Sequence, residues 1–282
     1  MENELTKEEL YLEISNLSKE VKSLYKKLDK SEKYRTHFLS NMRNCIVNPF
    51  TSIMGLSEHI VKVQQHDWKK VIQVSALIHS EAFDLDFQLK NIFCAAEVEA
   101  GSKIPISVGI NIPDHLEEEI NSMRFLFRKK GINCIIEHEN LDDVFYTDSA
   151  FISLILSNVI HNAYKYSKND GEIHIKTNRT PNNIEFIIKD FGIGISKENR
   201  ETIFNRFERI NDEINSIDSG QGLGLSVVKM LLELLNGQIL IESELNAYTE
   251  VRLMIPEMDN TGKESSDDSE VLDFFIDEGA IF

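Results

Sequence analysis

The sequence predicts an α+β protein in two parts: an N-terminal helical hairpin that forms a dimeric four-helix bundle, and then an α/β sandwich. Two long segments with helical apolar spacing meet at a short turn near residues 64–67. Beyond Gly101 the pattern changes to short alternating runs interspersed with helical ones. This succession is typical of one mixed sheet with helices on one face.

The first segment, residues 1–35, is rich in Glu, Lys and Leu, and its apolar positions recur at intervals of three and four. These positions are Ile14, Leu17, Val21, Leu24 and Leu28. The interval is that of a coiled-coil seam, although a solvated helix with one apolar stripe has the same pattern over two heptads. Both interpretations stay open for this coiled-coil or helical linker.

Residues 36–101 are assigned to the hairpin. Its second helix runs from about residue 69 to residue 100, and Gly101 is expected to end it. The short turn forces the two helices antiparallel. One hairpin buries little surface alone, so the sequence predicts a homodimer.

Residues 102–256 are assigned to the sandwich. Helical patterns cover 115–130 and 148–166, and strand patterns follow as EIHIKT, NIEFIIKDF, QILIES and EVRLMIP. Residues 257–282 form an acidic tail whose first half is expected to be disordered. Its end, VLDFFIDEGAIF, has an apolar face suited to docking in a groove, and a frayed terminus is the alternative.

Composition excludes several classes of protein. A hydrophobic share of 41% supports a real core, whereas a net charge of −17 argues against binding to nucleic acid or to anionic membrane surfaces. The three cysteines are too few and too scattered for a disulfide framework, so we expect reduced thiols in a cytoplasmic protein. No stretch approaches the roughly 20 apolar residues of a membrane span.

One stretch, FLSNMRNCIVNPF at residues 38–50, crowds polar side chains into the turn before a proline. Arg43, Asn44 and Asn48 precede Pro49, which costs about 3 kcal/mol in a helix interior and kinks the axis. An ordinary bent helix and a chemically altered site are both compatible with these residues.

The block NVIHNAYKYS at residues 158–167 places Asn158 and Asn162 on one helix face, with Lys165 and Tyr166 just beyond. An amide oxygen coordinates Mg²⁺, a lysine neutralises a phosphate, and a tyrosine ring stacks on a base. A buried amide pair on a polar strip is the structural alternative.

Three more blocks follow. DFGIGIS at 190–196 sets Asp190 beside Gly192 and Gly194, so that a ligand can approach the backbone closely. FNRFERI at 204–210 leaves Arg206 free on a short helix. GQGLGLSVVK at 220–229 precedes an apolar helix whose N-terminal N–H groups can hold phosphates. Its glycines are Gly220, Gly222 and Gly224.

In this order and spacing the four blocks resemble the N, G1, F and G2 boxes of the histidine-kinase-type ATP-binding domain. That superfamily includes gyrase, mismatch-repair ATPases and heat-shock chaperones, and the resemblance covers residues 38–256. It implies ATP and Mg²⁺ as cofactors, with a lid over roughly residues 208–221. The resemblance implies that Asn162 ligates Mg²⁺ with the help of Asn158, and that Lys165 and Arg206 contact phosphate. It implies that Tyr166 and Asp190 contact the adenine, in a base pocket shaped by Gly192 and Gly194. The lid would be anchored by Gly220, Gly222 and Gly224.

One position distinguishes branches of this superfamily. Its ATPases carry a glutamate four residues before the magnesium asparagine, as a base that activates water. Asn158 stands there in this chain and cannot take a proton. The resemblance therefore favours the histidine-kinase branch, in a two-component or phosphorelay pathway.

The helix before the proline resembles the family motif S-H-E-L-R-T-P, in which the histidine accepts the γ-phosphoryl group. Asn44 replaces that histidine, Cys45 replaces the acidic residue, and Asn48 matches the Thr-or-Asn position. An amide nitrogen is not a comparable nucleophile because its lone pair is delocalised. Autophosphorylation at the usual position is therefore predicted to be lost.

Three functions remain open. The chain is a pseudokinase that controls a partner through dimer geometry and nucleotide state, or a kinase that phosphorylates a histidine in trans or at His37, or a phosphatase. The last would use Asn48 to orient water toward the aspartyl phosphate of a response regulator. The implied partner is a receiver domain or another histidine kinase. His79 and His161 are expected to be structural.

Overall fold

The computed structural model describes residues 7–63, 67–141, 144–200, 202–204 and 222–260, with the backbone alone at 8–10, 12–14 and 26–45. The chain divides into two compact units, Met1–Leu89 and Lys90–Phe282, which are taken separately below. The predicted acidic tail lies almost wholly outside the described residues, so its roles stay predictions.

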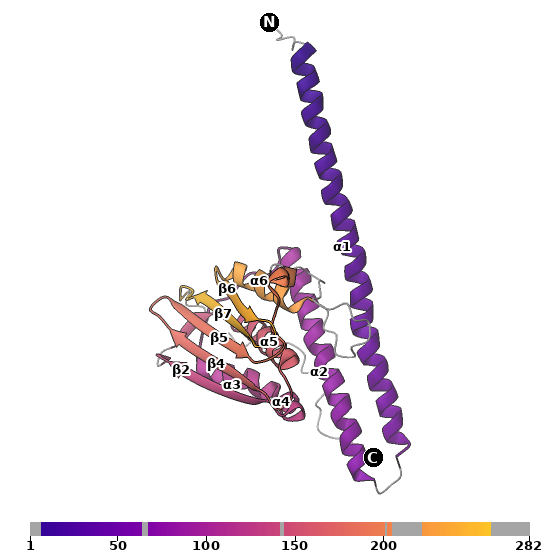
Figure 1. Ribbon diagram of the computed structural model, residues 1–282, viewed down its shortest axis with the longest axis vertical. Coiled ribbons are helices and arrows are strands. Elements are labelled where there is room, and N and C mark those ends of the chain that lie inside the picture. Colours follow the sequence, from indigo (N-terminus) through magenta and orange to yellow (C-terminus); the bar gives the residue numbers. More distant parts are fainter. Residues whose placement is uncertain (1–6, 64–66, 142–143, 201, 205–221, 261–282) are drawn as a thin grey trace. The chain divides into compact units, whose positions relative to one another are not determined.

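The first unit is the helical hairpin. Helix α1 (Lys7–Val61) and the beginning of helix α2 (Trp68–Glu99) run antiparallel, as predicted (Figure 1). Helix α1 continues through Pro49. Its side chains at the predicted seam positions 17, 21 and 24 are exposed. This exposure is compatible with a second copy at the seam, and both the coiled coil and the dimer stay predictions.

Helix α2 ends in a Schellman motif built on Gly101. This glycine has φ +66°, and its N–H donates to the Val98 carbonyl oxygen (3.0 Å). The Ser102 N–H reaches back to the Glu97 carbonyl oxygen (3.1 Å). Glycine adopts this left-handed conformation without steric cost, so the predicted breaker ends the helix.

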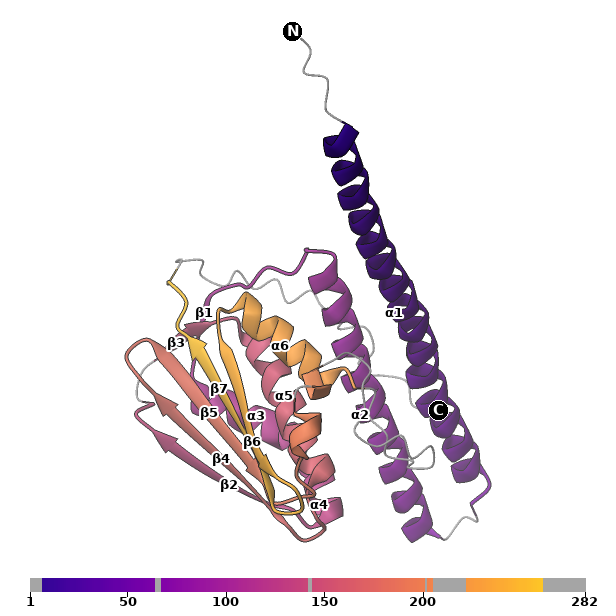
Figure 2. The ribbon, with the colours of Figure 1, turned by 45° about the horizontal axis from the view of Figure 1, so that its top comes forward.

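The second unit is the predicted sandwich. A five-stranded mixed sheet has the order β2-β4-β5-β7-β6, with β2 parallel to β4 and the other neighbours antiparallel. Helices α3, α5 and α6 cover one face (Figure 2). The helices are α3 (Ile112–Ser122), α4 (Arg124–Lys130), α5 (Ser149–Tyr166) and α6 (Gly224–Leu234). The strands are β2 (Asn133–Glu139), β4 (Glu172–Arg179), β5 (Asn183–Asp190), β6 (Gln238–Glu244) and β7 (Tyr248–Pro256).

Two features of this unit differ from the sequence prediction. The helical pattern at 115–130 forms two helices that break at Met123. A small second sheet pairs β1 (Val108–Ile110) with β3 (Phe145–Thr147). Three-residue strands carry no readable periodicity, so the sequence pattern missed them.

Strands β4 and β5 alternate between buried and less buried side chains. Every second side chain of β4 and β5 is buried, and these positions include Ile173, Ile175, Ile184, Phe186 and Ile188. They meet the apolar face of α5, in which Ile152, Ile155 and Ile160 are fully enclosed. The core therefore lies between the sheet and α5, and the last residue of β5, Asp190, is also buried.

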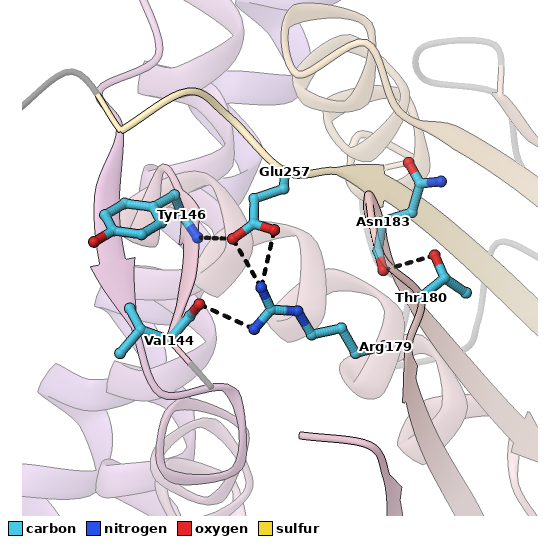
Figure 3. A network of polar contacts seen from close by, with 6 residues as sticks. All are labelled: Val144, Tyr146, Arg179, Thr180, Asn183 and Glu257. Carbon is cyan, nitrogen blue, oxygen red and sulfur yellow. Dashed lines mark hydrogen bonds and ion pairs between the residues drawn. The ribbon is translucent and has the colours of Figure 1, made fainter. Parts of the chain in front are cut away.

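A cluster of polar contacts lies at the end of the sandwich where β4 and β7 end (Figure 3). The Arg179 Nη2 donates to both carboxylate oxygens of Glu257 (2.9 and 3.0 Å), and Nη1 donates to the Val144 carbonyl oxygen (2.9 Å). Glu257 also accepts from the Tyr146 N–H (3.1 Å). The cluster ties the residue after β7 to β3 and to the end of β4.

Candidate nucleotide site

Helix α5 supplies the first group of site residues. Its N-cap is Asp148, whose Oδ1 accepts from the Phe151 N–H (2.9 Å) while Oδ2 accepts from the Ile106 N–H (2.7 Å). Capping fixes where the helix begins and therefore which side chains face the sheet. Asn158 and Asn162 follow on one face, one turn apart, with Tyr166 at the end of the helix.

Asn158 is 1% exposed and held by two hydrogen bonds. Its Nδ2 donates to the Leu154 carbonyl oxygen (2.7 Å) and to Oδ1 of Asn91 (2.7 Å), a buried residue of α2 within the same unit. The Asn158 Oδ1 has no partner within the described part of the chain. A Cβ on Gly224 would lie 2.6 Å from this oxygen, so the N box meets the G2 box here.

The G1 loop begins at Asp190 and packs on the end of α5. The Gly192 N–H donates to Oδ1 of Asp190 (3.0 Å), and the Ile193 N–H donates to the Tyr166 carbonyl oxygen (3.2 Å). A Cβ on Gly192 would lie 2.0 Å from that same carbonyl oxygen. Only glycine fits, and the close approach sets Asp190 beside the end of the N box.

Gly194 turns the loop toward β6. Its φ is +64°, and a Cβ there would lie 2.0 Å from the Glu244 carbonyl oxygen. The Ile193 carbonyl oxygen accepts from the Asn246 N–H (2.7 Å). The Ile195 N–H donates to Oγ of Ser243 (2.8 Å), so the loop is fixed on both sides.

Burial raises the pKa of the Asp190 carboxyl to about 6, against the Gly192 N–H and the charge of Lys130, which lower it. The carboxylate therefore predominates at neutral pH at a cost in free energy. It is an acceptor placed in a protected site, which suits an exocyclic amino group of a base.

Lys130 is a site residue that sequence analysis missed. Its Nζ donates to the carbonyl oxygens of Tyr164 (2.7 Å) and Lys165 (2.8 Å), which are among the last carbonyls of α5. Cations stabilise such helix ends. The basic cluster at 128–130 was the available signal, although nothing local relates it to α5.

The two predicted contact residues at the end of α5 lie together. The Lys165 Nζ is 5.4 Å from the centroid of the Tyr166 ring, a cation–π distance. Tyr166 is exposed and Lys165 is partly exposed. Asn162 is also partly exposed and is therefore more accessible to a ligand than the enclosed Asn158.

The G2 segment leads into α6. Gly222 has φ +69°, and the helix begins at Gly224 after Leu223, whose apolar side chain makes no capping hydrogen bond. The first N–H groups of such a helix can bind an anion. Arg206, Gly220 and the predicted lid lie outside the described residues.

The residues present fit Mg²⁺–ATP. Among the described residues no cluster of His, Cys, Asp and Glu could hold a metal. The donors here are amide oxygens, which suit a hard cation that is also bound by phosphates. The Asn158 Oδ1, which has no partner among the described residues, and the buried Asp190 carboxylate are acceptors of the kind that such a ligand needs.

The acceptor-like segment lies within helix α1. Asn48 is exposed, and Pro49 follows it in the helix. The side chains of Asn44, Cys45 and His37 lie outside the described residues. No helix in the described part of the chain is long and apolar enough to cross a membrane.

Residues 147–259 match the family described as "Histidine kinase-, DNA gyrase B-, and HSP90-like ATPase". A curated relative, autoinducer 2 sensor kinase/phosphatase LuxQ of Vibrio vulnificus, is 31% identical over 235 residues, which are 81% of this chain and 27% of that protein. The chain spans 27–34% of the first curated relatives that it matches.

Two solved structures of histidine kinases share the fold over most of the chain. The Acinetobacter baumannii histidine kinase AdeS has a TM-score of 0.53 at 18% identity, over 77% of this chain and 98% of that one. Histidine kinase ThkA in complex with response regulator TrrA has a TM-score of 0.51 at 21% identity, over 90% and 68%. The predicted fold class, helices followed by an α/β ATP-binding domain, is confirmed.

Proposed function

We propose that this chain is an ATP-binding pseudokinase of two-component signalling. The premise is that it carries a sensor histidine kinase catalytic core, whose residues 147–259 match the histidine kinase-, gyrase B- and HSP90-like ATPase family. One observation carries the proposal. The described parts of the N, G1 and G2 boxes are assembled around α5. By the resemblance of the sequence, Asn44 stands where the family places its phosphoacceptor histidine.

Each residue of the site has a proposed role. The Asp190 carboxylate accepts from the adenine amino group, and the exposed Tyr166 ring stacks beside the base. Asn162 ligates Mg²⁺, Lys165 meets phosphate, and the N–H groups around Gly224 hold phosphate at the start of α6. Bound Mg²⁺–ATP supplies an activated γ-phosphoryl group.

The acceptor side lacks its nucleophile. The amide of Asn44 has a delocalised lone pair, and Cys45 does not supply the carboxylate that would orient a base. Nucleotide binding then acts through the geometry of the homodimer on a receiver domain or on another histidine kinase. The complex of ThkA with a response regulator supports a partner of this kind.

Labelling with γ-labelled ATP tests the proposal. We expect Mg²⁺-dependent nucleotide binding by calorimetry and no acid-labile label on the chain. The double variant Asn44→His with Cys45→Glu is the matched control, because it restores the family's acceptor and acid. Label on this variant alone identifies a competent nucleotide site with a lost acceptor. Acid-labile label on the natural chain would contradict the pseudokinase, and its disappearance in His37→Ala would identify the acceptor.

A phosphatase is the second candidate. Asn48 is exposed on α1 directly before Pro49, and LuxQ is named as a sensor kinase/phosphatase. The measurement is the decay of a phosphorylated receiver domain with the natural chain and with Asn48→Ala. Faster decay that depends on Asn48 supports this candidate, and equal decay with and without the protein removes it.

A further inference from the structure

The buried pair Asn91–Asn158 joins helix α2 to the nucleotide site. Asn91 is 3% exposed and Asn158 is 1% exposed, so neither amide exchanges its partner for water. Asn91 lies on α2 and therefore outside residues 147–259, which match the ATPase family. A residue of the second hairpin helix thus contacts the N box directly.

The hydrogen bonds determine how the Asn158 amide is oriented. The Leu154 carbonyl oxygen is an acceptor and Nδ2 is the only donor of the Asn158 side chain, so Nδ2 must face it. The second hydrogen of Nδ2 points to Asn91, which must present its Oδ1. With both hydrogens engaged, the Asn158 Oδ1 faces the start of α6, beside Gly224.

The Asn158 Oδ1 accepts no hydrogen bond from the described part of the chain, and leaving a buried polar atom unpaired costs free energy. Without Asn91, the amide loses the contact that holds its second hydrogen. We propose that Asn91 is a positioning residue of the nucleotide site: it fixes the Asn158 amide so that its oxygen is presented to the Mg²⁺–phosphate end of the ligand. The inference rests on the proposed nucleotide binding.

The test uses the full chain and a non-hydrolysable ATP analogue, with affinity measured in Mg²⁺ and in EDTA. Asn91→Leu removes the acceptor at similar volume. We expect it to reduce the ratio of the two affinities by about five- to tenfold, the typical worth of one hydrogen bond, with the affinity in EDTA unchanged. Asn91→Asp keeps an acceptor oxygen and should keep the ratio.

Cys94→Ala is the matched control. Cys94 is 3% exposed in the same part of α2 and takes no part in the two hydrogen bonds of Asn158 described above, so its truncation loosens packing and leaves those bonds in place. It should lower the melting temperature and leave the Mg²⁺ ratio unchanged. An Asn91→Leu variant that behaves like this control would overturn the positioning role.

A second measurement needs no ligand. The melting temperatures of Asn91→Leu, Asn158→Leu and the double variant form a cycle, in which the two losses should be non-additive. Additive losses would overturn the inference. If the natural chain itself shows no Mg²⁺-dependent affinity, the proposed function fails and this role fails with it. The result for the natural chain therefore decides the function, and the variants decide the role of Asn91.

Discussion

Replacement of Asp190 by asparagine is expected to stabilise the ligand-free protein at neutral pH. Asp190 is 5% exposed, and burial raises the pKa of its carboxyl from 3.8 to about 6. Between pH 3.8 and about pH 6 the folded protein keeps a proton on Asp190 that the unfolded chain has lost. The penalty for ionising the folded carboxyl is therefore absent below pH 3.8, grows up to pH 6 and is complete above it. It reaches at most about 3 kcal/mol.

Asparagine removes the charge and keeps an oxygen for the Gly192 N–H. Its new amide hydrogens need partners at every pH, which reduces the gain, so we expect a free energy of unfolding higher by about 1–3 kcal/mol near pH 7.5 and unchanged or lower near pH 4. Urea unfolding followed by far-UV circular dichroism measures both values. Glu185→Gln, on the opposite face of β5, is the control and should show no pH-dependent gain. A loss at pH 7.5, or an equal gain at both pH values, would refute the reasoning.

Two further substitutions probe the surroundings of this carboxylate, and a third tests the polar cluster at the opposite end of β4 and β5. Gly192→Ala puts a Cβ 2.0 Å from the Tyr166 carbonyl oxygen, so the backbone must move, and urea unfolding should show a loss above about 2 kcal/mol together with weaker ATP binding. Lys130→Met removes a charge that lowers the pKa of Asp190, so calorimetry should find a greater loss of ATP affinity near pH 6 than near pH 8, whereas an equal loss contradicts the electrostatic role. Arg179→Met breaks the ion pair of Figure 3 and should cost about 1–3 kcal/mol of stability with ATP affinity unchanged; a large change in affinity would connect that cluster to the site.

Local signals predicted much of the fold. Alternation identified the central strands because one face of each is buried, and Gly101 ended α2 because the left-handed position there suits glycine. The site blocks were visible because glycines and amides occur where close approach and ligation need them. These signals depend on neighbours in the sequence.

The remaining features depend on contacts between distant segments. The pairing of β1 with β3 joins two three-residue strands that have no pattern of their own. Lys130 reaches the end of α5 only after both helices pack, and Asn91 meets Asn158 across 67 positions. The sequence suggested a buried amide pair within the N box, whereas the partner of Asn158 lies on α2. Helix packing, which no short window contains, decides these contacts.

Two costs in free energy within the second unit bear on the proposed nucleotide binding. The Asp190 carboxylate is buried at a pH where water would solvate it better, and the Asn158 oxygen is enclosed without a described partner. Packing alone does not need the charge of Asp190, because an asparagine there would lower the free energy of the folded state, and the hydrogen bonds of Asn158 use only its Nδ2 and not this oxygen. A ligand that carries an amino group to the first and a hydrated cation to the second would compensate both costs at once. The stability deficit of the free protein and its gain on adding Mg²⁺–ATP should therefore come from the same two residues, and this supports the proposed nucleotide binding.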